Sequence, residues 1–323
     1  MWRSPIVARY RQRDTDYASP QTLVPGTRTE IFSEDLGKNA LIYCADPHAK
    51  TVLYTTHADY QQVFRHPFLF MAQFETAQAL IEVPASSLEQ MDMGVTSKPI
   101  YIFSIGRCGS TAILKKLSLG GIPAASEPDL PTQIALFRPQ IVQAFGEAKI
   151  SALIRAMNRS LASHLGQRFV VKFRSQCNLI VDDILNAQLE AETIFMLRQG
   201  DTWQRSMHRA FRLTGEKMAI DLRDGILAYH RLIALNANPK LIWYEDMLAD
   251  ANSVLRRLGV TQPPGEDRPD DMEDSQAGTS LARVNIKETA VEEWVRQTFM
   301  ATWAKIRPKC LDDLPEISSR LGL

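Results

Sequence analysis

Two hydrophobic periodicities alternate along most of the chain. Short apolar runs bounded by polar residues or glycine predict β-strands at 100–105, 122–125, 169–172, 192–198 and 239–246. Apolar residues that recur at three- and four-residue spacing predict helices at 112–119, 139–165, 178–189, 202–213, 221–235 and 288–306. Strands that alternate with helices are typical of a parallel sheet covered on both faces. We therefore predict an α/β fold, a parallel β-sheet flanked by helices.

The first part of the chain has a different pattern. Two β-prone runs, 40–44 and 51–55, flank a polar stretch and predict a hairpin. Residues 63–81 are rich in Phe, Leu, Met and Ala, which favours packing in a core over a wall for an acyl or aromatic substrate. The polar stretch 84–98 indicates a boundary. We expect an additional N-terminal α+β segment, 1–97, of unknown role, and a larger domain over 98–323.

Composition excludes several classes of protein. The chain has 323 residues, and its Lys+Arg and Asp+Glu counts are both 37, so no global field favours nucleic acid. No apolar run is long enough to span a bilayer, and the arginine-containing start has no signal-peptide core, so we expect a solvated arm there. The four cysteines lie far apart, without the spacing of a zinc or redox motif. These features predict a cytoplasmic protein that needs no metal.

A glycine-containing loop follows the first strand of the predicted sheet. Its sequence is Gly106-Arg107-Cys108-Gly109-Ser110-Thr111. Glycine lets the backbone turn at positive φ and approach an anion, and the N–H groups at the start of the next helix favour phosphate or sulfate. The nucleoside-triphosphate loop has four residues between its glycines and then a Lys, whereas this loop has two residues, then Ser110, and carries its cation as Arg107. The alternative is a Gly/Ser turn without a ligand.

This loop resembles the phosphosulfate-binding loop of the P-loop sulfotransferases, with Cys108 in place of the usual Ser. In that family the loop binds the donor 3'-phosphoadenosine 5'-phosphosulfate (PAPS). A second match is Arg198 at a strand end with Ser206 eight positions later, which in the family hold the 3'-phosphate of the donor. Gly200 stands where many members have a Pro. The alternative is an exposed arginine and an ordinary helical serine.

The resemblance also implies catalytic roles. Glu127 stands where protein-tyrosine sulfotransferases and many bacterial relatives have a general base, and a helix cap is its alternative. Lys172 would reach the bridging or sulfuryl oxygens. Because Phe173-Arg174 breaks the family pattern after Lys172, Arg174 could share that duty, and a structural salt bridge is the alternative. Arg107 would stabilise charge on the transferring group. Arg283 lies where relatives close a basic loop over the donor.

The resemblance covers residues 98–323 and includes Tyr244-Glu245-Asp246, a family segment to which we assign a structural role. It implies in-line transfer of a sulfuryl group from PAPS to an acceptor hydroxyl or amine. Cationic side chains and N–H groups would stabilise the transition state without a metal. The expected acceptor is a small molecule or a glycan, with no nucleic-acid partner, and a homodimer is left open.

Two other functions are open from the sequence. A P-loop kinase or nucleotide hydrolase is favoured by the run 179–183, an apolar stretch ending in two Asp that imitates the Mg²⁺-binding strand of those enzymes, although the loop Lys is missing. A noncatalytic nucleotide-binding protein on the same fold is allowed by the departures at Cys108, Gly200 and Phe173.

Overall fold

The computed structural model describes residues 1–13, 16–32, 36, 40–88, 97–260 and 293–322. The chain forms two compact units, each built from two stretches of sequence. Unit 1 combines Met1–Tyr101 with Pro123–Glu192, and unit 2 combines Ile102–Ile122 with Thr193–Leu323. The expected division into 1–97 and 98–323 stays a prediction, and most of the polar stretch 84–98 on which it rests lies outside the described residues.

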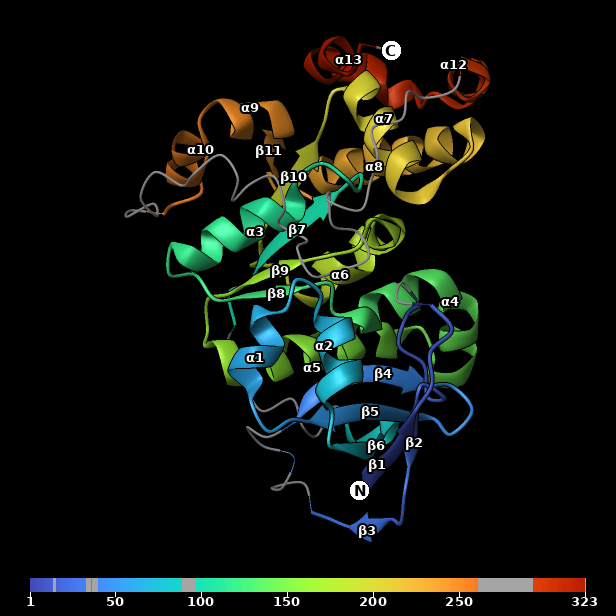
Figure 1. Ribbon diagram of the computed structural model, residues 1–323, viewed down its shortest axis with the longest axis vertical. Coiled ribbons are helices and arrows are strands. Elements are labelled where there is room, and N and C mark those ends of the chain that lie inside the picture. The colour runs from blue at the N-terminus through green and yellow to red at the C-terminus, as the bar shows by residue number, and fades with distance from the viewer. Residues whose placement is uncertain (14–15, 33–35, 37–39, 89–96, 261–292, 323) are drawn as a thin grey trace. The chain divides into compact units, whose positions relative to one another are not determined.

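The predicted parallel sheet is confirmed. Its strand order is β11-β10-β7-β9-β8 (Figure 1), with β7 in the centre. The strands are β7 (Ile100–Ser104), β8 (Ala124–Ser126), β9 (Val170–Lys172), β10 (Glu192–Leu197) and β11 (Lys240–Trp243). Every residue of β7 is buried, which explains why this strand reads as a continuous apolar run instead of an alternating one.

A second sheet in unit 1 is antiparallel. Its order is β2-β1-β6-β5-β4, and the short β3 (Thr29–Glu30) pairs with β1. The strands are β1 (Trp2–Arg9), β2 (Leu23–Pro25), β4 (Leu41–Asp46), β5 (Thr51–Thr56) and β6 (Ala79–Pro84). β4 and β5 form the predicted hairpin. Two short helices, α1 (Tyr60–Arg65) and α2 (Leu69–Thr76), connect β5 to β6.

The sequence led us to expect a solvated arm at the basic start of the chain. This segment instead forms the strand β1. β1 pairs with β6 in the sheet, and Arg9 donates a hydrogen bond of 2.8 Å from Nε to the carbonyl of Phe74. The Arg11 guanidinium lies 4.2 Å from the centroid of the Phe74 ring. Phe68 and Phe70 are buried, so the core interpretation of 63–81 is confirmed.

The remaining helices of unit 1 depart from the predicted boundaries. In place of one helix over 139–165 there are α4 (Asp129–Phe145) and α5 (Ala148–Leu165). Gly146 separates them at φ 88°, a conformation that favours glycine and ends a helix. The predicted helix 178–189 is the 3₁₀ helix η3 (Ser175–Ile180) followed by α6 (Val181–Ala187).

Unit 2 supplies the helices around its own strands. They are α3 (Ser110–Leu119), α7 (Gly200–Phe211), α8 (Gly215–Ala234), α9 (Tyr244–Ala249), α10 (Ala251–Arg257), α12 (Glu293–Ile306) and α13 (Pro315–Leu321). Gly120 ends α3, as predicted. The predicted strand 239–246 was too long, because β11 ends at Trp243 and α9 begins at Tyr244.

The helix α12, predicted within 288–306, is amphipathic, with Val295, Phe299 and Trp303 buried. Trp294 of the same helix is 55% exposed. Arg283 lies outside the described residues. Within the part of the chain that is described, no helix combines the length and the apolar character needed to cross a membrane.

Candidate functional site

The loop between β7 and α3 holds three residues in the left-handed region. These are Gly106 at φ 74°, Arg107 at φ 50° and Gly109 at φ 79°. Glycine adopts this conformation without strain, whereas Arg107 does so against its preference, a kind of strain that clusters at ligand sites. Gly109 is the N-cap of α3 and, because it has no side chain, it makes no capping hydrogen bond to the first turn. The positive end of the α3 dipole therefore has no side-chain cap, as an anion site requires.

Gly109 also makes a close packing contact. A Cβ at this position would lie 2.6 Å from Cδ2 of Tyr244, the first residue of α9. The Tyr244 ring also contacts Arg198, whose guanidinium carbon lies 4.3 Å from the ring centroid. Tyr244 therefore fixes both the loop and Arg198. Sequence reasoning gave Tyr244 only a structural role as a family marker, and its contact with Gly109 joins residues too far apart in sequence to be read from spacing.

The structure brings the loop together with Arg198 and Ser206, as the resemblance implied. Arg107 Nε donates to Ser206 Oγ at 3.4 Å, and Arg198 Nη1 donates to the carbonyl of Arg107 at 3.2 Å. Trp203, on the same helix as Ser206, donates from Nε1 to the carbonyl of Gly106 at 3.0 Å. Trp203 and Ser206 of α7 thus contact the loop, and Arg198, which follows β10, holds the Arg107 carbonyl. All of these residues belong to unit 2.

The other loop residues are buried. The Cys108 side chain is 0% exposed, and Ser110 and Thr111 are buried in the first turn of α3. Ser104 Oγ lies 3.5 Å from Ser110 Oγ and accepts from the N–H of Gly106 at 3.4 Å. Cys108 therefore fills a packed position where the family has a hydroxyl.

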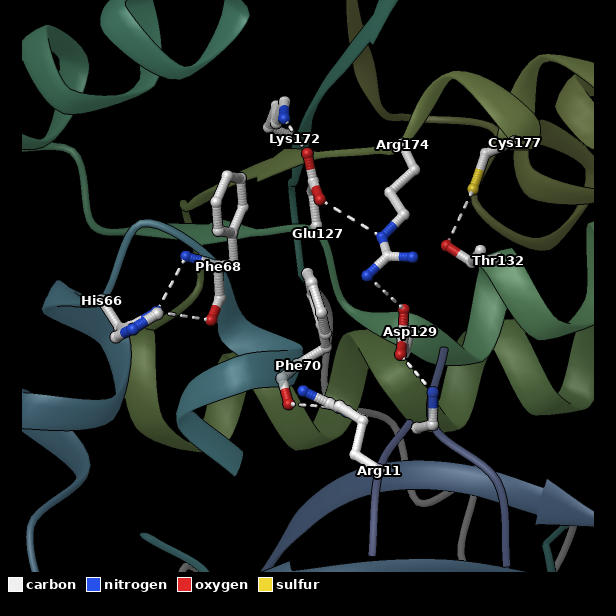
Figure 2. Close-up of polar contacts among 11 residues, drawn as sticks. Arg11, His66, Phe68, Phe70, Glu127, Asp129, Thr132, Lys172, Arg174 and Cys177 are labelled. Carbon is white, nitrogen blue, oxygen red and sulfur yellow. Dashed lines mark hydrogen bonds and ion pairs between the residues drawn. The ribbon is translucent and has the colours of Figure 1, made fainter. Parts of the chain in front are cut away.

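Glu127 and Lys172 lie in unit 1 and contact each other (Figure 2). The Glu127 N–H donates to the carbonyl of Lys172 at 2.7 Å, and Lys172 Nζ donates to Glu127 Oε1. Arg174 Nε donates to Glu127 Oε2 at 3.2 Å. The side chains of Glu127, Lys172 and Arg174 are only 13%, 6% and 12% exposed, so these ion pairs are poorly screened by water.

The sequence left a helix cap open as an alternative role for Glu127. Its carboxylate instead contacts Lys172 and Arg174. The N-cap of α4 is Pro128, which makes no side-chain capping hydrogen bond. Glu127 sits at φ 57°, which turns its side chain to the two cations instead. The salt bridge that we considered for Lys172 is present, and Arg174 shares it.

Asp129 is a member of this cluster that sequence reasoning missed. It is fully buried, its Oδ1 lies 3.5 Å from Arg174 Nη2, and its Oδ2 accepts from the N–H of Ala18. Burial raises the pKa of Asp129 to about 6, although Arg174 and the Ala18 N–H oppose that change. The one signal in the sequence was a second acid two positions after Glu127.

Two aromatic residues from the N-terminal segment face the cations. The Arg174 guanidinium carbon lies 3.7 Å from the centroid of Phe70, and Lys172 Nζ lies 5.8 Å from that of Phe68. Both phenylalanines are buried. The segment to which the sequence assigned no role thus packs against the predicted catalytic residues.

The structure places the predicted residues in two groups. One is the loop with Arg198 and Ser206 in unit 2, and the other is Glu127 with Lys172 in unit 1. No protein-family model matches the sequence, and no curated protein matches it significantly. The finding that stands is an α/β domain with a five-stranded parallel sheet, whose central strand leads into a loop beside two arginines.

Proposed function

We propose that the protein is a PAPS-dependent sulfotransferase that moves a sulfuryl group to an acceptor hydroxyl or amine. The observation that carries the proposal is the convergence of Arg107, Arg198 and Ser206 on the loop before α3. Two fixed guanidinium groups and an uncapped helix N-terminus suit a ligand with two separate anionic groups. PAPS has such groups in its 5'-phosphosulfate and its 3'-phosphate.

In this proposal each part of the loop region has one task. The N–H groups from Gly106 to Thr111 hold the 5'-phosphosulfate, and Gly109 allows its close approach. Arg198 and Ser206 bind the 3'-phosphate. Arg198 already contacts the loop through the Arg107 carbonyl, so its orientation is set before the donor arrives.

The chemical step requires a base and a cation at the bridging oxygen. Glu127 takes the acceptor proton as the acceptor oxygen or nitrogen forms its bond to sulfur. The bond from sulfur to the bridging oxygen breaks, and its electron pair stays on the departing adenosine 3',5'-bisphosphate. Lys172 and Arg107 stabilise that charge. We assign this task to Lys172 and not to Arg174, because Arg174 is already held between two carboxylates and the Phe70 ring.

The kinase or nucleotide-hydrolase alternative has lost its best support. Residues 179–183 belong to η3 and α6 instead of a strand, and Asp183 accepts from Arg138 Nε at 3.0 Å. The Mg²⁺-binding Asp of P-loop nucleotide hydrolases follows a buried strand, which this run does not form.

Calorimetric titration of the intact protein tests the donor site. We expect binding of adenosine 3',5'-bisphosphate and much weaker binding of AMP or of ATP with Mg²⁺. Arg198→Ala should weaken the bisphosphate by about 10- to 150-fold, since a hydrogen bond to a charged group contributes roughly 1.5–3 kcal/mol. The affinity for AMP, which lacks the 3'-phosphate, should change little in this variant. The control is Arg205→Ala on the following helix α7, where Arg205 is half exposed and pairs with Asp201.

Two results would contradict the proposal. One is tighter binding of ATP with Mg²⁺ than of the bisphosphate, and the other is an equal loss for AMP and bisphosphate in Arg198→Ala. Transfer of label from [³⁵S]PAPS to a panel of small-molecule and glycan acceptors then tests catalysis. Tight bisphosphate binding without transfer to any acceptor would favour the noncatalytic alternative.

A further inference from the structure

We infer that Asp129 is a positioning residue that sets the Glu127 carboxylate through Arg174, and that the N-terminal segment holds this arrangement. The inference rests on the proposed role of Glu127 as the general base. It gives a function to Asp129 and to the segment that precedes the P-loop domain.

Arg174 connects the two acids directly. Its Nε donates to Glu127 Oε2 at 3.2 Å, and its Nη2 lies 3.5 Å from Asp129 Oδ1. Figure 2 shows Arg174 between the two carboxylates, with Glu127 on one side and Asp129 on the other. The planar guanidinium has its donors in a fixed fork, so the ion pair between Nη2 and Asp129 favours one direction for Nε. The position of Asp129 therefore determines where Arg174 holds Glu127.

The N-terminal segment fixes the far side of this connection. The N–H of Ala18 donates to Asp129 Oδ2, and the Phe70 ring lies against the flat face of Arg174. Arg11 lies over the rings of Phe70 and Phe74 and donates weakly to the Phe70 carbonyl at 3.5 Å. Arg174 is thus restrained at both edges and on one face. Such restraint of a supporting group is what holds a catalytic side chain in one orientation.

Packing alone does not require a charged side chain at position 129, so we infer that the charge of Asp129 has a function. Its carboxylate is fully buried, and burial raises its pKa to about 6, so keeping it ionised at neutral pH costs desolvation energy. An amide of the same shape would fill the space without that cost. The ionised group attracts Arg174 and leaves less of its positive charge for Glu127. A neutral residue in place of Asp129 would remove the ion pair that holds the far edge of Arg174.

Several charged or titratable groups face Asp129. They are Arg174 and Glu127 beside β9 and β8, Arg11 in the N-terminal segment, Tyr43 and Cys44 on β4, and Cys177 in η3. Burial raises the pKa of Cys44 and of Cys177, so both thiols are neutral at pH 5–8. Asp129 itself is then the member of this group whose pKa of about 6 lies inside the assay range.

The pH profile of Asp129→Asn tests the inference. At about pH 8 we expect kcat to fall by roughly 10- to 100-fold, the scale of a small misplacement of a reacting group. The KM for donor and the bisphosphate affinity should stay within about twofold of wild type. Near pH 5 about nine-tenths of the wild-type Asp129 is protonated and resembles Asn, so the ratio of the two kcat values should shrink to roughly 2–10. A packing defect would keep that ratio constant across the pH range and would overturn the inference.

A double-variant comparison shows whether Asp129 acts through Arg174. In an Arg174→Gln background, adding Asp129→Asn should change kcat by no more than about twofold, because the connection is already broken. Independent, multiplicative losses would contradict it. Asp183→Asn is the matched control, since this acid also pairs with an arginine, Arg138, at the surface of unit 1. Its kcat and pH profile should equal those of wild type.

A readout without turnover separates this inference from the proposed function. Urea midpoints are measured for Glu127→Gln, Asp129→Asn and the pair, with Arg174 intact and with Arg174→Gln. Non-additive midpoints that become additive without Arg174 support the connection, even if no acceptor is ever sulfated and the proposed function fails. Additive midpoints in both backgrounds overturn the inference, even in an active sulfotransferase.

Discussion

Gly109 packs closely against Tyr244 because it has no side chain. Its φ of 79° requires the left-handed region, and a Cβ would meet the Tyr244 ring at 2.6 Å. Gly121, just after α3, has a similar φ of 88°, but a Cβ there would meet no atom within 4 Å. The two glycines therefore share the backbone strain of a substitution and differ in the clash.

We expect Gly109→Ala to weaken bisphosphate binding by at least about tenfold, because the displaced Tyr244 ring moves both the loop and Arg198. Gly121→Ala should bind like wild type while losing a comparable amount of stability to strain. Calorimetry gives the affinities, and circular dichroism confirms that both variants are folded. Normal affinity in a folded Gly109→Ala protein would show that the close approach at Gly109 is not needed.

At this scale local spacing marked the loop residues and the Arg198–Ser206 pair, and the resemblance implied that the two segments meet. The two glycines, Arg107 and the Arg198–Ser206 pair lie near one another in the structure, as the resemblance implied. Asp129 and Tyr244 were missed as members of these clusters because their partners, such as Ala18 and Gly109, are far away in sequence. Hydrophobic periodicity does not predict contacts between residues so far apart in the sequence.

Among the elements, the packing of α8 against α12 has the least room. Gly215 begins α8, and a Cβ there would lie 2.2 Å from the carbonyl oxygen of Val295 and 2.4 Å from the backbone nitrogen of Phe299. Both are backbone atoms, so no rotamer change can relieve the overlap.

We therefore expect Gly215→Ala to destabilise the protein by about 1–3 kcal/mol, the usual scale of overpacking, despite the better helix propensity of alanine. Glu216→Ala, at the neighbouring exposed position, should stay within about 0.5 kcal/mol of wild type. The urea midpoints of both variants measure this. A Gly215→Ala protein as stable as wild type would mean that α12 can move away from α8 at little cost.

The strands of the parallel sheet were predictable from the sequence because burial on both faces makes each one a continuous apolar run. The helix boundaries were less predictable from the sequence. The single helix expected over 139–165 is divided at Gly146, where the apolar spacing continues across the break. The apolar run ending at Tyr244 continues from β11 into α9, so hydropathy alone did not mark where the strand ends.

For the whole molecule, the proposed donor residues all belong to unit 2, whereas Glu127 and Lys172 belong to unit 1. A ligand that binds only the folded state suppresses local opening where it binds, by about 2.7 kcal/mol at 100 times its Kd. Hydrogen exchange can therefore locate the donor site without an assay for turnover.

We expect saturating bisphosphate to slow amide exchange at 106–113 and in α7, and to leave the hairpin of β4 and β5 unchanged. Arg198→Ala at the same ligand concentration should lose most of that protection. Protection confined to unit 1 would place the nucleotide elsewhere and contradict the proposed donor site.

The discontinuous arrangement of unit 2 has a consequence for synthesis of the chain. The loop at Gly109 leaves the ribosome well before Tyr244, against which it packs. At translation rates of roughly 5–20 residues per second, the interval is on the order of ten seconds. During that time the apolar β7 has emerged while its neighbour β10 is still unmade. The nascent chain thus exposes a strand that the finished sheet buries completely, at the stage when chaperones bind such strands. The packing of the loop at Gly109 is complete only after α9 is translated.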